Sequence, residues 1–179
     1  LQTVGASLGE RSLETSLLAG AIGIALVMLF MIVVYRLPGL VSALTLFFYT
    51  ALFAVILAVT HANLTLPGIA GMILTVGMAV DANVIIFERI KEELRAGKSL
   101  RTSIDNGYHN AFTAILDSNI TTAIAAVVLW WRGSGTIVGF AQTLLIGVVL
   151  SMFTMLVITR ILLKSLVNLK ITKLWAYGA

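Results

Sequence analysis

The sequence contains no cysteine, only two prolines and two histidines, and charged residues make up 11% of its 179 positions. The absence of cysteine excludes disulfide bonds and thiolate metal sites. The two histidines, His61 and His109, are far apart in the chain, so we expect no metal site. There is also no Gly-rich phosphate loop, no HExxH motif and no Ser-His-Asp set typical of a soluble active site. We therefore expect no enzymatic activity, no ATP site and no cofactor beyond protons as the coupling ion.

Hydrophobic residues, in contrast, make up 59% of the chain, and its mean hydropathy is +1.03. A helix needs about 20 apolar residues to cross a hydrocarbon core of about 30 Å. Lipid offers no hydrogen-bond partners, so the backbone N–H and C=O groups of such runs must bond to each other, as they do in a helix. The sequence therefore predicts an all-α integral membrane protein, a five-span helical bundle within residues 17–165. The expected spans are residues 17–36, 40–60, 66–87, 111–131 and 138–163.

The basic residues predict the orientation of this bundle. Ten of the twelve Lys and Arg residues fall on the side that holds residues 88–110 and the C-terminus, whereas only Arg11 and Arg132 fall on the other. Since Lys and Arg are enriched in cytoplasmic segments, we expect a cytoplasmic tail over 166–179 and an extracytoplasmic lead-in over 1–16. An odd number of spans with an outside N-terminus also suggests that a first span precedes Leu1.

The polar segment 88–110 has a pattern of its own. The third span is expected to continue as a helix to about Ala96 and to stop at Gly97, while Ser99 can cap a second helix. The apolar residues of that second helix recur every four positions, at Leu100, Ile104, Tyr108 and Phe112. This stripe predicts a short helix over 99–110 that lies along the inner membrane surface, although a connector that buries its apolar side explains it equally well. The surrounding basic residues suit anionic membrane lipid, and nothing here resembles a nucleic-acid motif.

Two of the spans carry a carboxylate in the same short motif. Asp81 stands in an Asp-x-Asn sequence with Asn83, and Asp117 stands in another with Asn119. A carboxylate at a helix centre costs about 2.5–3.5 kcal/mol on insertion scales, so such a residue faces protein or water, pairs with another group, or carries a proton. A carboxyl group held away from water can take up and release a proton near neutral pH.

Both carboxylates are expected at the same depth. Asp81 lies eight residues from Arg89 and Asp117 lies eight residues from His109, which is about 12 Å of helix in both cases. For Asp81 we favour a proton relay over a structural hydrogen bond. For Asp117 the two interpretations stay open, because Asn119, Thr121 and Thr122 can support it by hydrogen bonds. Glu88 and Arg89 mark the cytoplasmic end of the helix that carries Asp81.

Small residues at helical spacing run beside these positions, and such stripes allow close helix packing where no hydrophobic force drives association. Together with the two carboxylates, they predict that Asp81 and Asp117 lie at a seam between helices rather than against lipid. The stripes are Gly68, Gly71, Thr75, Ala79 and Ala82; Ala111, Ala114, Ser118, Thr121 and Ala125; and Gly139, Thr143, Gly147, Ser151 and Thr154.

Four stretches together resemble the SecD/SecF family, and in particular its SecD members. They are VGASLGERSLETSLLAG near the start, LPGIAGMILTVG, VGMAVDANVIIFERIKEELRAGKSL and AILDSNITTAIAAVVL. The resemblance extends over nearly all of residues 3–165, and the string from Asp81 to Arg89 favours SecD over SecF. It implies a helical bundle similar to half of a resistance-nodulation-division exporter. SecD proteins have six spans with a large periplasmic domain after the first, so this sequence would hold spans two to six, as a separate SecD or as the SecD half of a fused SecDF.

The same resemblance implies a function. The family uses the proton gradient to help draw preproteins across the bacterial cytoplasmic membrane, beside the Sec translocon channel and together with SecF. Its essential fourth-span carboxylate corresponds to Asp81, and its fifth-span Asp-x-Asn-x-Thr-Thr run corresponds to Asp117–Thr122. We accordingly expect Asp81 to face a second, SecF-like half. A lipid or drug exporter of the same superfamily and a non-transporting membrane scaffold are the alternatives.

Overall fold

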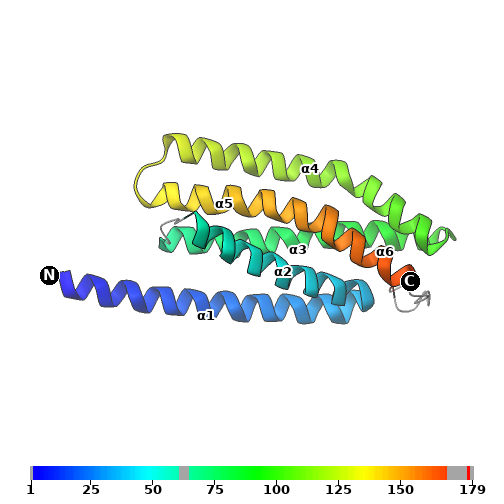
Figure 1. Cartoon of the computed structure of the whole chain (residues 1–179), viewed down its shortest axis with the longest axis horizontal. Helices are drawn as coiled ribbons and strands as arrows, with labels where there is room; N and C mark the ends of the chain where they lie inside the picture. Colours follow the sequence, from blue (N-terminus) through cyan, green and yellow to red (C-terminus); the bar gives the residue numbers. More distant parts are fainter. Residues whose placement is uncertain (1, 61–64, 169–176, 178–179) are drawn as a thin grey trace.

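The computed structural model describes residues 2–60, 65–168 and 177, and it is an antiparallel bundle of long helices (Figure 1). In chain order, the elements are α1 (Gln2–Tyr35), α2 (Leu37–Val59), α3 (Leu66–Arg95), α4 (Leu100–Arg132), α5 (Thr136–Phe153), the π-helical turn η1 (Thr154–Thr159) and α6 (Arg160–Asn168). The part of the chain that is described has five helices long and apolar enough to cross a membrane, the last formed by α5, η1 and α6 together. The predicted fold class is confirmed.

Helix α3 occupies the centre of the bundle, where it contacts α5, α4, α1 and α2. Helices α1 and α4 lie on opposite sides of it (Figure 1). Most side chains of α1 that the structure describes are exposed, and its contacts are with α2 and α3. The expected lead-in, residues 1–16, has no separate structure in its described part, because residues 2–16 are the first turns of α1. Most of the predicted tail, 166–179, and His61 lie outside the described residues.

The two predicted signals between α3 and α4 are confirmed. Helix α3 ends at Arg95, and Gly97 follows with a φ of 82°, a left-handed conformation that glycine adopts without strain. Ser99 is the N-cap of α4, and its hydroxyl accepts a hydrogen bond from the Thr102 backbone N–H at 3.3 Å. The chain therefore turns back within residues 96–99 and forms a helical hairpin.

The prediction of a separate surface helix over 99–110 is wrong. Helix α4 runs without interruption from Leu100 to Arg132. Leu100, Ile104 and Tyr108 are buried in one core cluster with Ile90 and Leu94 of α3. Their apolar stripe thus packs on the bundle, which was one of the two orientations that the spacing left open. We call residues 88–110 the hairpin arm; because helices of 30 and 33 residues measure about 45–50 Å, this arm extends beyond the apolar spans.

The small residues of α3 and α5 form a close helix contact. A Cβ atom added to Gly147 would lie 2.5 Å from three side-chain atoms of Thr75, and one added to Gly71 would lie 2.5 Å from the Thr143 hydroxyl. These two stripes therefore interlock within the chain, as small-residue spacing predicts. The stripe on α4 behaves differently, because Ala111 is buried whereas Ala114, Ser118, Thr121 and Ala125 are exposed.

Candidate functional site

Asp81 and Asn83 point to opposite sides of α3. Residues two apart on a helix are separated by about 200°, so only one of them can face the bundle. Asp81 is exposed, whereas Asn83 is 4% exposed and donates a hydrogen bond from Nδ2 to the Ser42 hydroxyl of α2 at 3.1 Å. The other amide atom of Asn83, Oδ1, is buried without a hydrogen-bond partner among the described residues.

Helix α4 repeats this arrangement. Asp117 is exposed, whereas Asn119 is buried and donates from Nδ2 to the Ile115 carbonyl at 2.7 Å. The hydroxyls of Thr121 and Thr122 donate to the backbone carbonyls of Asp117 and Ser118, four residues earlier, at 2.8 and 2.9 Å. The Asn and Thr residues that were expected to support the carboxylates thus bond to backbone or to α2, and each Asp side chain faces outward.

The packing of α3 on α4 places the two carboxylates at nearly the same height. A Cβ atom on Gly107 of α4 would lie 2.5 Å from Cγ1 of Ile90, which fixes the register of these antiparallel helices. Asp81 lies nine residues from Ile90 and Asp117 lies ten residues from Gly107, or about 14 and 15 Å along the respective helices. The structure therefore brings Asp81 and Asp117 to one level of two neighbouring helices.

The surface around Asp81 differs from the predicted one. The stripe from Gly68 to Ala82 is buried on the other side of α3, where Gly68, Gly71 and Thr75 pack against α5. Asp81 instead belongs to an exposed stripe, spaced 4, 3, 4 and 4 residues. Its members are Ala70, Leu74, Gly77, Asp81 and Ile85. No other described helix of this chain covers this stripe, which we call the Asp81 face. It is apolar apart from the carboxylate, and Gly77 leaves it open at its centre, since a Cβ there meets nothing within 4 Å.

Glu88 and Arg89 lie on the hairpin arm, seven and eight residues beyond Asp81. Glu88 pairs with Lys91 at 3.3 Å and Arg89 pairs with Glu92 at 2.7 Å, both along the helix. The ammonium group of Lys91 also lies 4.3 Å from the ring centre of Tyr35, at the end of α1. The exposed Arg89–Glu92 pair contributes about 0–1 kcal/mol, whereas the buried Lys91 also joins this end of α3 to α1.

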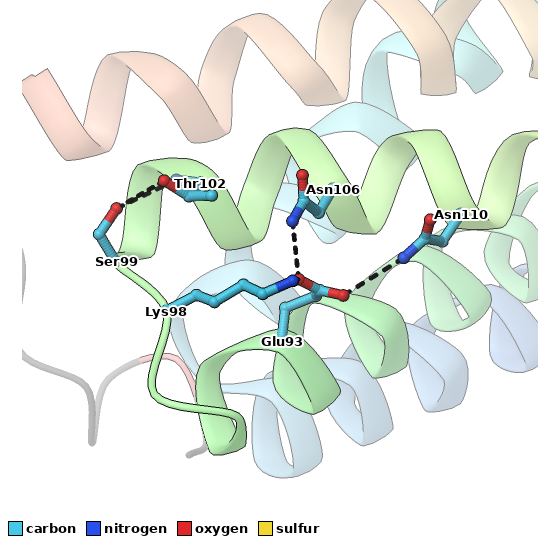
Figure 2. A network of polar contacts seen from close by, with 6 residues as sticks. All are labelled: Glu93, Lys98, Ser99, Thr102, Asn106 and Asn110. Atoms are coloured by element: carbon cyan, nitrogen blue, oxygen red, sulfur yellow. Dashed lines mark hydrogen bonds and ion pairs between the residues drawn. The ribbon is translucent and has the colours of Figure 1, made fainter.

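Sequence reasoning missed a polar network within the hairpin arm (Figure 2). Glu93 accepts hydrogen bonds from Lys98 at 2.6 Å, from Asn106 at 2.8 Å and from Asn110 at 3.3 Å. Lys98 above all, and then Asn106, lower the pKa of Glu93, which lies beyond the apolar part of α3. These hydrogen bonds, which we call the clasp around Glu93, join the end of α3 to the start of α4. The spacing of Asn106 and Asn110, four residues apart on one side of α4, was the available signal.

No group of three or more His, Asp or Glu residues that could hold a metal ion occurs within residues 2–60, 65–168 and 177. The site is thus a pair of outward-facing carboxylates on an otherwise apolar helical surface. Such groups can bind a proton or a monovalent cation, or they can pair with a cation on a helix outside this chain.

Comparison with known proteins decides the family. The family model described as "Protein export membrane protein SecD/SecF, C-terminal" matches residues 1–169. The chain belongs to the SecD/SecF family. Its relatives include the protein translocase subunits SecD of Synechocystis, 55% identical over 90% of this chain, and of Acidaminococcus fermentans, 51% identical over 96%.

A solved structure agrees with this family. The crystal structure of SecDF from Thermus thermophilus, described as a translocon-associated membrane protein, matches 90% of this chain with a TM-score of 0.88 and 44% identity. The match extends over 23% of that protein. The chain likewise spans 34% and 41% of the Synechocystis and Acidaminococcus relatives. What is shared is therefore the helical bundle and its sequence, in proteins that are considerably longer.

Proposed function

We propose that this chain is the membrane bundle of a SecD-type subunit that aids preprotein export through the Sec machinery of the bacterial cytoplasmic membrane. Its relatives are named protein translocase subunits, and the solved SecDF is named a translocon-associated protein. The observation that carries the proposal is Asp81, an exposed carboxylate within an apolar helical face at the level of Asp117. A packed scaffold has no need to hold a charge on an outward surface of a membrane span, because the cost of placing it there is several kcal/mol.

The proposed mechanism couples a proton to the packing of this face. A proton that enters from outside binds Asp81, neutralises it and allows the helices around it to change their packing before release to the cytoplasm. One charge moved through 100 mV gains about 2.3 kcal/mol, which biases a two-state bundle roughly fifty-fold. In the proposed orientation the hairpin arm is cytoplasmic, since it carries Arg89, Arg95 and Lys98.

A SecF-like half is the proposed partner of the Asp81 face. The face is exposed in this chain, it is lined by Ala70 and Gly77, and small residues permit a neighbouring helix to approach closely. The Sec channel and the preprotein would be contacted by the assembled subunits. A lipid or drug exporter on the same scaffold is the second candidate, but the string from Val80 to Glu93 and the identity to SecD proteins favour protein export.

The decisive experiment replaces Asp81 by asparagine in the complete translocase, reconstituted in vesicles with an imposed proton gradient. Asp81→Asn keeps the size of the side chain but cannot carry a proton, so gradient-stimulated preprotein release should be lost while assembly is retained. Glu92→Gln is the matched control, because it makes the same neutral change at an exposed carboxylate of the hairpin arm. Full gradient-dependent release by Asp81→Asn would end the proton-carrier proposal. If Asp81 only holds helices together by hydrogen bonds, the reverse is expected: Asp81→Asn retains gradient-dependent release, and Asp81→Ala loosens the bundle.

A further inference from the structure

A groove with a volume of about 280 Å³ runs between the first turns of α4 and the junction of η1 with α6. This volume is close to the lower limit of about 300 Å³ for small-molecule sites. The groove is lined by Asp105, Tyr108, His109, Phe112, Leu156 and Arg160. It belongs to neither carboxylate motif, and it lies against α6 rather than on the Asp81 face.

The cations beside the groove are held in place by one carboxylate. Asp105 Oδ1 lies 3.0 Å from Nη2 of Arg160 and 2.6 Å from Nζ of Lys164. The Arg160 guanidinium also lies 5.5 Å from the ring centre of Tyr108. A smaller adjoining cavity is lined by Arg101 and Lys164. Two cations thus share a single carboxylate, which leaves a net charge of one positive unit, and the side chains of Arg160 and Lys164 remain 45% and 39% exposed. Arg101, across the adjoining cavity from Lys164, adds a further positive charge nearby.

The groove also has a polar end and an apolar end. Arg160 is the first charged residue after the uncharged stretch from Thr136 to Thr159, which is about 36 Å of helix and enough to cross a membrane. Leu156 lies one turn before Arg160, and Phe112 lies one turn after Tyr108 on α4, so both lie toward the middle of the bundle. The cations accordingly sit where an apolar core ends, with apolar side chains directly below them.

We propose that this groove binds the headgroup of an anionic phospholipid. Arg160 and Lys164 would bind the phosphate, with Arg101 adding to the positive field, and the acyl chains would run along Leu156 and Phe112. The charge of the groove and the order of its polar and apolar ends both complement such a lipid. Arginine suits this role because its planar guanidinium can keep one edge on Asp105 and present other donors to a phosphate.

Spin-labelled lipids provide the test. The full chain is reconstituted in phosphatidylcholine vesicles, and the motionally restricted fraction of labelled phosphatidylglycerol is compared with that of labelled phosphatidylcholine. Each interfacial cation contributes about 1 kcal/mol toward anionic lipid, so Arg160→Gln with Lys164→Gln should lower the preference by more than fivefold. Arg95→Gln, which removes an exposed cation outside the groove, should leave the preference unchanged.

Asp105→Asn separates lipid binding from a structural role of the same ion pairs. It keeps the shape of the side chain and frees both cations, so the preference for phosphatidylglycerol should increase. If Asp105 only fastens α6 to α4, Asp105→Asn and the double variant will both lower the melting temperature without changing the lipid preference, and the proposal fails. A wild-type preference that 10 mM inorganic phosphate abolishes would also overturn it, because the groove would then be a site for soluble anions.

Discussion

Asn83 of α3 is joined to Ser42 of α2 by a buried hydrogen bond of 3.1 Å, while Asp81, two residues earlier, is exposed on the opposite side of the same helix. One short motif therefore serves two surfaces. The amide fastens α3 to the bundle, and the carboxylate remains available on the outside. Asp117 is exposed and Asn119 is buried on α4 in the same way. A helix turns about 100° per residue, so the two polar side chains of each Asp-x-Asn motif face opposite sides of their helix.

The first prediction concerns the Asn83–Ser42 bond. Asn83→Ala should lower the free energy of unfolding by about 1–2 kcal/mol, because it removes a hydrogen bond between helices and leaves a buried hydroxyl without its partner. Unfolding of the chain in mixed detergent micelles measures this loss. In a double-mutant cycle, Ser42→Ala should cost little more once Asn83 has been replaced. Strictly additive effects of the two substitutions would show that the bond contributes nothing to stability.

The second prediction concerns the contact of α3 with α5. Gly147→Ala should destabilise the bundle by about 1–3 kcal/mol, because the added Cβ would lie 2.5 Å from Thr75 and the helices would have to separate. Gly77→Ala is the matched control on the Asp81 face, where a Cβ meets nothing within 4 Å. Alanine is the better helix former there, so the control should be neutral or slightly stabilising. Equal effects of both substitutions on the unfolding midpoint would contradict this account.

Hydropathy and capping were enough to predict the five helices, the turn at Gly97 and the cap at Ser99, because each depends on residues that are close in sequence. The partners of the helix faces were not predictable in this way. The stripe from Gly68 to Ala82 indicated close packing, but not that α5 would be the partner and that Asp81 would face away. Likewise, the stripe that includes Leu100 is compatible with a membrane surface or with α3, and only the tertiary structure decides between them.

The third prediction uses the clasp around Glu93. Its pKa in the folded chain is lower than the ordinary value of 4.5, chiefly because Lys98 stabilises the carboxylate. The ionised group therefore stabilises the fold fully above pH 4.5, and this contribution is lost as the pH falls through the lower, folded pKa. The melting temperature of Glu93→Gln should lie below that of the wild type at neutral pH, and the difference should shrink on acidification.

Lys98→Met provides the control for this pH dependence. It removes the largest cause of the lowered pKa and leaves the hydrogen bonds from Asn106 and Asn110. The loss of stability on acidification should then be smaller than in the wild type and complete at a higher pH, because the folded pKa of Glu93 lies closer to 4.5. A melting-temperature difference between Glu93→Gln and the wild type that stays constant from pH 7 to pH 3 would show that the charge of Glu93 is not involved.

The last prediction tests whether a second half covers the Asp81 face. Because the sequence contains no cysteine, single cysteines can be placed at Gly77 and Ile85, on either side of Asp81, and at Leu29, which is 60% exposed on α1. Reaction with a membrane-permeant maleimide is then compared for the chain alone and for the chain co-expressed with a SecF-like half. We expect Gly77→Cys and Ile85→Cys to react in the chain alone and to be protected in the assembly, while Leu29→Cys reacts in both. Protection at Leu29 instead would assign the interface to α1, and equal labelling of all three would leave Asp81 facing lipid, where a proton carrier has no neighbouring helix to act on.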